Sequence, residues 1–192
     1  MSKVAIAGNA SGTGTFTIAA PNSNTDRTLT LPDEAGTVLT SASETVLPKG
    51  VPIFYVTKSG NQTLTSNTST QVTFNTVQTD SHSYYSTSTN KFTPLTSGWY
   101  QVNVGLQGGT GAIQGIIGEL RKNGTVVGQQ STYLQSISYG DDLSLMISKL
   151  VYFNGSTDYI EVYATVVDSS AGTDVIFGGF YSWFEAILVR GA

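Results

Sequence analysis

An alternating run of apolar and polar residues constrains the fold of this chain more than any other feature. The apolar positions, two residues apart, are Tyr100, Val102, Val104 and Leu106, with Gln, Asn and Gly between them. A period of two over this length predicts a β-strand with one face in a core and the other face elsewhere. Gly98 stands just ahead of the run and allows the sharp change of direction that the corner of a β-sandwich needs.

Residues around this strand follow a specific order. They are Phe74, Tyr84 or Tyr85, Phe92, Thr93, Pro94, Gly98 and Tyr100. In this order they resemble the globular head of the complement component 1q family, a relative of the tumour-necrosis-factor jelly roll. The stretches LRKNG at 120–124 and FGGFYSWFEAILV at 177–189 resemble the family's hairpin turn and final strand. The resemblance spans residues 52–190 and implies an antiparallel jelly-roll sandwich in an all-β protein.

The composition argues against several classes of function. Only 11% of the 192 residues are charged, against a usual value of about 25%, which favours β structure with polar, uncharged surfaces. The nine Lys and Arg residues and the net charge of -4 argue against nucleic acid as a partner. The absence of cysteine excludes disulfides and thiolate metal sites and is consistent with assembly in a reducing cytoplasm. No stretch resembles a signal peptide or a membrane span, so neither export by that route nor membrane insertion is expected.

Residues 14–40 predict three short strands separated by turns rich in Pro, Asn, Asp and Gly. The large apolar side chains of these strands are Phe16, Ile18, Leu29, Leu31, Val38 and Leu39. So few residues cannot bury enough area to fold this piece alone, but three copies wrapped together would share one core. The residues expected at such a trimer interface are Phe16, Ile18, Leu29 and Leu31.

Part of this segment matches a short repeat. The matching residues are Gly14, Ile18, Ala19, Pro21, TLTLP at 28–32 and GTV at 36–38. They resemble the repeat of bacteriophage tail-fibre and tail-spike proteins, which implies a trimeric β stem or an attachment segment near the virion. The alternative is a floppy polar tail, but a tail has no reason to alternate so regularly.

Proline and glycine mark a boundary after this segment. Neither a helix nor a central strand can continue through Pro48, Gly50 and Pro52. The sequence therefore predicts an N-terminal stem or attachment segment over residues 1–45, a connector over 46–52, and a jelly-roll head over 53–192.

Turn residues divide the head into further strands. Asn123-Gly124 is the strongest hairpin signal in the chain, with a strand expected on either side. The other expected strands are residues 53–57, 71–74, 143–153 and 159–167, the last two around a second turn at Asn154-Gly155. The glycine-rich stretch 105–115 lacks the Lys-Ser/Thr ending of a phosphate-binding P-loop, so we expect a jelly-roll loop there.

The last strand is apolar on both faces. One face holds Phe180, Phe184, Ala186 and Leu188, and the other holds Tyr181, Trp183, Ile187 and Val189. Such a strand must be covered on both sides. The sandwich core can cover one face, and the resemblance implies that a neighbouring subunit across a threefold axis covers the other. Tyr181, Trp183 and Ile187 are therefore the expected trimer-interface residues of the head.

The sequence predicts no catalytic, cofactor or metal site. His82 is the only histidine and has Asp80 nearby, but nearness on a loop fixes no hydrogen-bond geometry, and no G-x-S-x-G nucleophile elbow exists. Asp141 and Asp142 could bind Ca²⁺ or act as a carboxylate couple. Adjacent residues on a strand face opposite ways, however, and an exposed turn is the default interpretation.

Aromatic residues in polar loops are the candidates for binding, because such side chains suit sugar faces and protein contacts. For Tyr84 and Tyr85 the resemblance makes a structural role the favoured one. The receptor-binding candidates are Tyr133, Tyr139, Asp141 and Asp142.

Together these features predict a homotrimeric structural protein of a bacteriophage virion, assembled in the host cytoplasm. Its N-terminal segment would attach to other virion proteins of the baseplate, tail or capsid. Its head would bind a host-surface glycan or protein. The alternative is a capsid decoration or cement protein that stabilises the shell, and a glycan-cleaving spike is a third, less favoured class.

Overall fold

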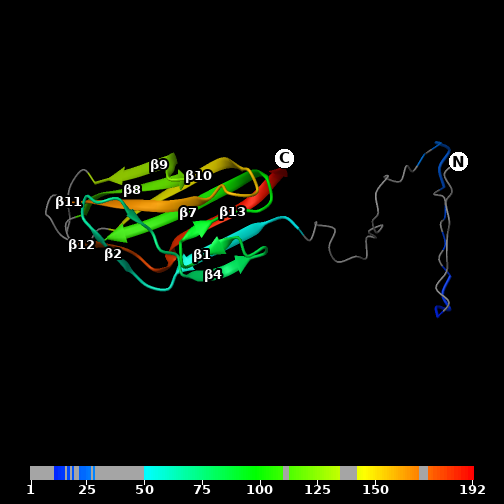
Figure 1. The fold of residues 1–192 in the computed structure, drawn as a ribbon, viewed down its shortest axis with the longest axis horizontal. Helices are drawn as coiled ribbons and strands as arrows, with labels where there is room; N and C mark the ends of the chain where they lie inside the picture. Colours follow the sequence, from blue (N-terminus) through cyan, green and yellow to red (C-terminus); the bar gives the residue numbers. More distant parts are fainter. Residues whose placement is uncertain are drawn as a thin grey trace. The chain divides into compact units, whose positions relative to one another are not determined.

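Every regular element among the described residues is a β-strand. The computed structural model describes residues 11–15, 17, 19, 22–26, 28, 50–109, 113–134, 142–168 and 173–192. The chain divides into residues 1–43 and residues 44–192, and each part is described by itself (Figure 1). In the part of the chain that the structure describes, no helix is long and apolar enough to cross a membrane.

The N-terminal part contributes few described residues. Those between 11 and 28 include no strand. The predicted interface residues Phe16, Ile18, Leu29 and Leu31 lie outside the described residues. The stem and the finer division into residues 1–45 and 46–52 therefore stay predictions.

Two antiparallel sheets pack against each other in residues 44–192. The first sheet runs in the order β2, β12, β7, β13, β1 and β4, and β10 also pairs with β7. Its seven strands are β1 (Ile53–Lys58), β2 (Gln62–Thr65), β4 (Thr76–Asp80), β7 (Gly98–Gly109), β10 (Leu143–Phe153), β12 (Thr173–Ile176) and β13 (Gly179–Gly191).

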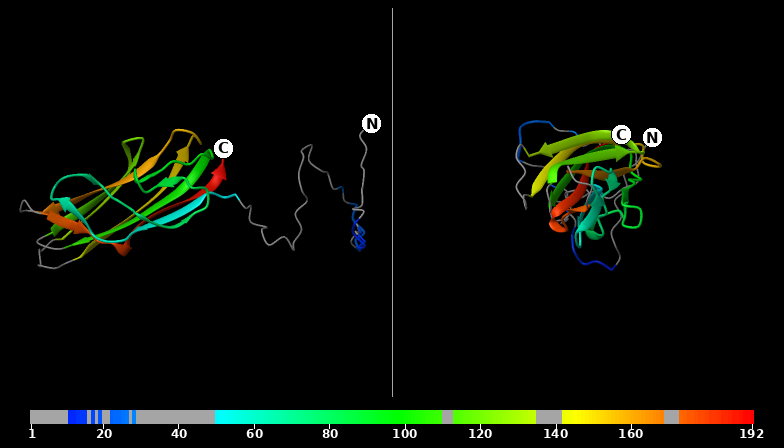
Figure 2. Two further views of the ribbon diagram at one scale, coloured as in Figure 1. Left: turned by 60° about the horizontal axis from the view of Figure 1, so that its bottom comes forward. Right: turned by 90° about the vertical axis from the view of Figure 1, so that its left-hand side faces the viewer.

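The second sheet runs in the order β5, β6, β11, β8 and β9, and β3 also pairs with β11. Its six strands are β3 (Thr70–Gln71), β5 (Tyr85–Ser86), β6 (Lys91–Phe92), β8 (Ile113–Lys122), β9 (Thr125–Tyr133) and β11 (Ile160–Asp168). Figure 2 shows the strands of the two layers from two further sides.

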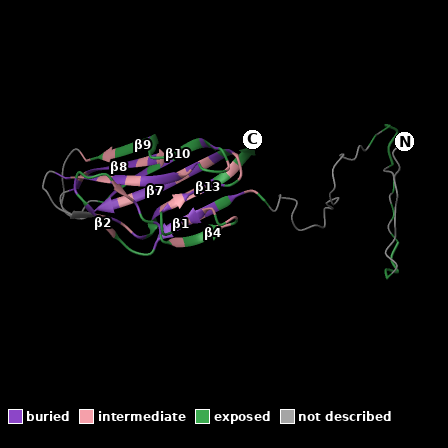
Figure 3. Cartoon of the chain, in the orientation of Figure 1, coloured by how far each residue is buried: buried purple, intermediate pink, exposed green. Residues whose placement is uncertain are grey.

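The core lies between the sheets, and β7 contributes one complete face to it. Tyr100, Val102, Val104 and Leu106 are all buried, which confirms the strand and the orientation that their alternation predicts (Figure 3). Gly98 begins this strand with a φ of 150°, and a Cβ atom there would lie 2.3 Å from the carbonyl oxygen of Arg190. Only glycine fits this approach of β7 to the end of β13.

Aromatic rings fill one part of the core. Phe54 stacks on Phe92 with ring centroids 4.2 Å apart and meets Phe184 edge-on at 4.8 Å. Tyr85 stacks on Phe54 at 5.5 Å, and its hydroxyl donates to the carbonyl oxygen of Phe74 at 3.0 Å. Burial raises the pKa of this hydroxyl, and the hydrogen bond to Phe74 opposes the rise in part. The structural role expected for Tyr85 is confirmed.

The Asn123-Gly124 turn joins β8 to β9 as a hairpin, as the sequence predicts. Its φ angles of 51° and 81° are those of a type I′ turn, in which Asn and Gly tolerate the left-handed region. The turn at Asn154 has a different role, because β10 pairs in the first sheet and β11 in the second. It carries the chain from one layer to the other.

Two sequence predictions about strands are wrong. Only Thr70 and Gln71 form the short strand expected over 71–74; the next residues carry the chain from the second sheet to the first. Val72 still donates its N–H to the carbonyl of Val162 at 2.9 Å, and both Val72 and Phe74 are buried. The alternation of Val72, Thr73 and Phe74 therefore indicates which side chains are buried, and it does not indicate a continuous strand.

The glycine-rich stretch 105–115 is not a long loop, because β7 continues to Gly109 and β8 begins at Ile113. Its glycines make room for side chains of neighbouring strands. A Cβ atom on Gly105 would lie 2.5 Å from Nε1 of Trp183, and one on Gly115 would lie 2.4 Å from Cδ1 of Tyr133. Close packing of large rings accounts for these glycines, whereas the sequence predicted a jelly-roll loop.

Candidate functional site

The outer face of the first sheet, which points away from the sandwich core, is the most distinctive surface of residues 44–192. We define it by the outward residues of β1, β13, β7 and β10. The strand register sets these residues in rows across the sheet. One row consists of Ile53, Ile187, Gln101 and Leu150, each opposite the next on the adjacent strand. Three of the four side chains in this row are apolar.

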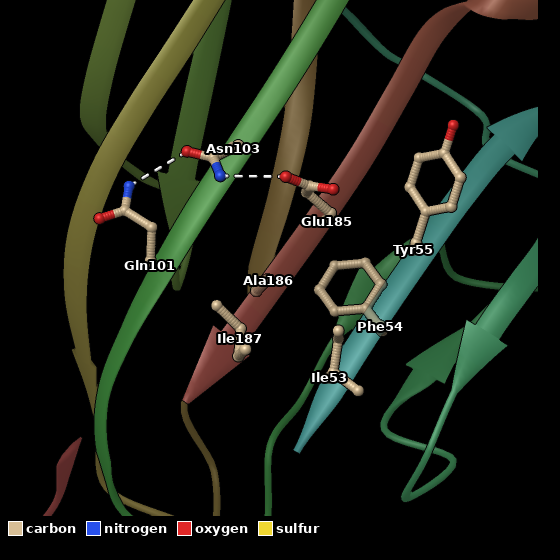
Figure 4. Close-up of a pocket in the computed structure, with 8 residues that line it drawn as sticks. All are labelled: Ile53, Phe54, Tyr55, Gln101, Asn103, Glu185, Ala186 and Ile187. Atoms are coloured by element: carbon tan, nitrogen blue, oxygen red, sulfur yellow. Dashed lines mark hydrogen bonds between the residues drawn. The ribbon is translucent and has the colours of Figure 1, made fainter. Parts of the chain in front are cut away.

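The neighbouring row is polar. It consists of Tyr55, Glu185, Asn103 and Ser148. Asn103 donates its amide Nδ2 to Glu185 Oε1 at 3.1 Å. Gln101 donates its Nε2 to Asn103 Oδ1 at 3.1 Å and to Ser148 Oγ at 2.9 Å. This amide network fixes the Glu185 carboxylate in the middle of the outer face, as Figure 4 shows.

A third row contains Trp183 and Met146 on either side of Gly105. The indole of Trp183 lies over Gly105, as the short distance to a hypothetical Cβ there indicates. At the other end of the face, Trp99 meets Tyr152 edge-on with ring centroids 5.6 Å apart. Large rings therefore occupy both ends of the polar network.

A shallow hollow of about 100 Å³ opens beside this network (Figure 4). Its lining residues are Ile53, Phe54, Tyr55, Gln101, Asn103, Glu185, Ala186 and Ile187. The hollow could receive one protruding side chain of a partner. Its volume is smaller than that of most ligand pockets, which is about 300–1,000 Å³.

Exposed apolar side chains are numerous on the outer face. They are Ile53, Trp99, Met146, Leu150, Tyr152, Tyr181, Ile187 and Val189, each with 39% to 64% of its surface exposed. A patch with this many exposed apolar side chains, crossed by one polar row, marks an interaction surface more often than ordinary monomer surface. Glu185 is the charged side chain in the middle of this patch, and Arg190 lies at its end, opposite Trp99.

The interface residues predicted for the head lie on this face. The structure brings Tyr181, Trp183 and Ile187 together on the outward side of β13. Phe180, which was expected on the core side, is instead 77% exposed. The reason is that the core ends at Ser182, which is fully buried and accepts the N–H of Gln107 at 3.2 Å.

The predicted receptor-binding residues are described only in part. Tyr133 is 56% exposed at the end of β9, and Asp142 is exposed just before β10. Gln107 donates its Nε2 to Asp142 at 3.5 Å. Tyr139 and Asp141 lie outside the described residues, so their receptor role stays a prediction.

The histidine does not form a catalytic relay with its neighbours. Its Nδ1 lies 2.7 Å from Ser81 Oγ, which accepts the N–H of Ile53 at 3.0 Å. Asp80, however, accepts the backbone N–H groups of His82 at 3.4 Å and Tyr85 at 2.8 Å, and makes no bond to the imidazole. These contacts stabilise a turn. Within the described ranges, no cluster of His, Asp and Glu could hold a metal ion.

Sequence reasoning missed the residues of the amide network. Gln101 and Asn103 alternate with the core residues of β7, so the pattern placed them on the non-core face without showing what they contact. The partners come from β13 and β10, which lie far along the chain. Only the strand register reveals this network.

No protein-family model matches the sequence, and no curated protein sequence matches it. Solved structures do match. The globular domain of zebrafish complement 1qA protein aligns with a TM-score of 0.56 at 14% identity, over 74% of this chain and 100% of that domain. Murine APRIL aligns with a TM-score of 0.54 at 7% identity, over 73% of this chain and all of the other.

A third match is the Eiger TNF of S. frugiperda, with a TM-score of 0.52 at 13% identity, over 74% of this chain and 93% of the other. Identities this low establish the fold alone. The fold is a jelly roll of the complement 1q and tumour-necrosis-factor type, which confirms the fold class predicted for the head.

Proposed function

We propose that this protein is a structural component of a bacteriophage virion, a homotrimeric fibre that attaches to the particle by its N-terminal segment and binds the host surface with its jelly-roll head. The outer face of the first sheet carries the proposal. Ile187 and Trp183 of β13 lie on an apolar surface that a single chain leaves uncovered. Association of identical chains would remove this surface from water.

The outer face of the head and the sequence of the N-terminal segment both favour an assembly of three chains. The family resemblance implies a threefold arrangement for the head, and the large apolar residues of the segment 14–40 are too few to form a core except one shared between chains. Both parts of the chain thus favour the same partner number. Agreement between independent segments supports a single trimeric assembly.

Attachment to the particle is proposed because the N-terminal repeat resembles phage tail-fibre segments. Binding of the host surface is proposed for the part of the head where Tyr133 and Asp142 are exposed. Tyr139 and Asp141 stand between these two residues in the sequence. Three heads on each fibre and several fibres on each particle would multiply a weak contact with a glycan or protein. No strong single site is required.

Immunogold electron microscopy with an antibody to residues 51–192 tests this location on intact particles. Label at the tail or baseplate is expected. Label spread over the shell would instead support the capsid decoration alternative, in which the same trimer stabilises the shell. Particles that carry no label would contradict both structural roles in the virion.

A further inference from the structure

The outer face of the second sheet lies on the opposite side of the sandwich from the outer face of the first sheet. Its residues alternate with buried core residues, such as Ile116 on β8 and Val166 on β11. β9 forms one edge of this sheet and is exposed over most of its length (Figure 3). Covering the first sheet with other copies of the chain would therefore leave this second face open to a ligand.

One half of this face is a closed network of charged groups. Arg121 forms an ion pair with Glu119, and its guanidinium carbon lies 3.9 Å from the ring centroid of Tyr163. Lys91 forms an ion pair with Glu161 at 3.9 Å. The charges in this half are therefore balanced within the chain, and none of them calls for a charged ligand.

The other half of the face consists of two rows of outward residues. They are Val167, Gly115 and Tyr133 in one row, and Thr165, Ile117 and Ser131 in the next. Gln129 follows on β9, two residues before Ser131. In the part of the chain that the structure describes, the hydroxyls of Thr165 and Ser131 and the amide of Gln129 have no hydrogen-bond partner. These three groups are free to bind a polar ligand.

Tyr133 adds an aromatic ring to these polar groups. Its Cε1 lies 2.6 Å from the position that a Cβ atom on Gly115 would occupy, so the glycine makes the space in which the ring packs on the sheet. Tyr133 is nevertheless 56% exposed, whereas Ile117 and Val167 beside it are half-buried. One side of the ring thus lies against the sheet, and the other side is open to solvent.

A sugar is the ligand that matches this combination. The C–H groups of a pyranose pack on an aromatic ring, and its hydroxyls exchange hydrogen bonds with hydroxyl and amide groups. Outward residues of one strand, such as Ser131 and Tyr133, follow one another at about 6.7 Å, so a short oligosaccharide can contact several of them. A protein partner matches less well, because the centre of such an interface is a cluster of large desolvated side chains, and Tyr133 is the one exposed ring of these two rows.

We propose that Tyr133, Ser131 and Gln129 of β9 and Thr165 of β11 bind a neutral oligosaccharide on the outer face of the second sheet. This inference rests on the proposed binding of the host surface, and it adds the location of the site and the chemical class of the ligand. It also separates Tyr133 from Asp142, whose carboxylate lies beside Gly109 in the first sheet.

A glycan array tests this site in the full chain. The array carries neutral oligosaccharides of hexoses and N-acetylhexosamines beside sialylated and sulfated ones, and we expect the neutral members to bind. Tyr133→Ala should weaken this binding by at least about 10-fold, because it removes the ring on which the sugar packs. Tyr133→Phe should retain most of the binding, because it keeps the ring. Gly115→Ala should also weaken binding, because the new methyl group displaces the ring from its place on the sheet.

Phe180→Ala is the matched control, because Phe180 is an exposed ring outside the two rows. It should bind as the wild type does. Unchanged binding in Tyr133→Ala, an equal loss in Phe180→Ala, or binding only to charged members would overturn the site. Circular dichroism melting identifies a variant that fails to fold. If Tyr133→Ala fails to fold, Gln129→Ala decides the question: reduced binding is expected, and full binding would overturn the site.

The array also distinguishes this inference from the proposed function. A wild-type protein that binds no member of the array would overturn the oligosaccharide site. The proposed role in the virion would stand in that case if the immunogold label lies at the tail or baseplate, and it would fall with the site if the particles carry no label.

Discussion

At the scale of single residues, Lys58 is the most unusual side chain of the head. Only 3% of its surface is exposed, and its ammonium group donates to neutral acceptors, the carbonyl of Thr73 at 2.6 Å and Oε1 of Gln62 at 3.0 Å. None of these acceptors is a carboxylate. Burial therefore lowers the pKa of Lys58 to about 8. Nothing near Lys58 in the sequence indicates this burial, because a lysine at the end of a strand is ordinarily solvated.

This burial predicts that stability rises at mildly alkaline pH. The unfolded chain keeps the Lys58 proton up to its ordinary pKa of about 10.4, whereas the folded chain loses it near pH 8. Between these values the unfolded state binds more protons, so the free energy of unfolding rises with pH. From pH 7 to pH 9.5 the rise from this group is about 2 kcal/mol.

Urea denaturation of the wild type and Lys58→Met at the two pH values measures this effect. The rise should disappear in Lys58→Met, and an equal rise in both proteins would contradict the assignment. The pH range of the comparison ends below pH 10 because burial raises the pKa of Tyr100 to about 12. A raised tyrosine pKa makes the folded state lose stability as pH rises further, which is the opposite sign.

At the scale of strands, alternation in the sequence predicted much of the head. It identified β7 and the two-faced β13, because apolar residues at every second position leave few other structures possible. The Asn123-Gly124 hairpin followed from turn chemistry alone. Pairing could not be predicted in the same way, since alternation in β10 and β11 does not say that they belong to different sheets.

Glycine was the least predictable residue type at this scale. Gly105 lies inside β7 because the indole of Trp183 occupies the space that a side chain would need. Nothing near Gly105 in the sequence shows this, since Trp183 lies on another strand far along the chain. The outer face of the first sheet could not be predicted for the same reason, because each of its rows combines residues from strands that lie far apart in the sequence.

Substitution of Gly105 tests this packing. In Gly105→Ala the new methyl group would lie 2.5 Å from Nε1 of Trp183, so the ring must move. We expect a loss of about 1–3 kcal/mol in the free energy of unfolding, as in other overpacked sites. Gly191→Ala is the control, because a Cβ atom there meets nothing within 4 Å. Equal stability of both variants would contradict the proposed packing of Trp183 on Gly105.

At the scale of the whole molecule, the fold and the function depend on different kinds of information. The jelly-roll fold follows from residues 44–192 and their match to solved structures. The proposed role in a virion depends on the N-terminal repeat and on the uncovered apolar face of the first sheet. In the proposed assembly, covering that face by identical chains would connect the two, because it would join three heads and three N-terminal segments in one fibre.

The mass of the full chain in solution tests this claim most directly. Multi-angle light scattering at micromolar concentration should give three times the 20.3 kDa of a single chain. Replacement of the apolar Ile187 by Asp, in the middle of the outer face, should lower that mass because it buries a second carboxylate beside Glu185. A wild-type mass of one chain would contradict the account, since the outer face would then remain uncovered in the native protein.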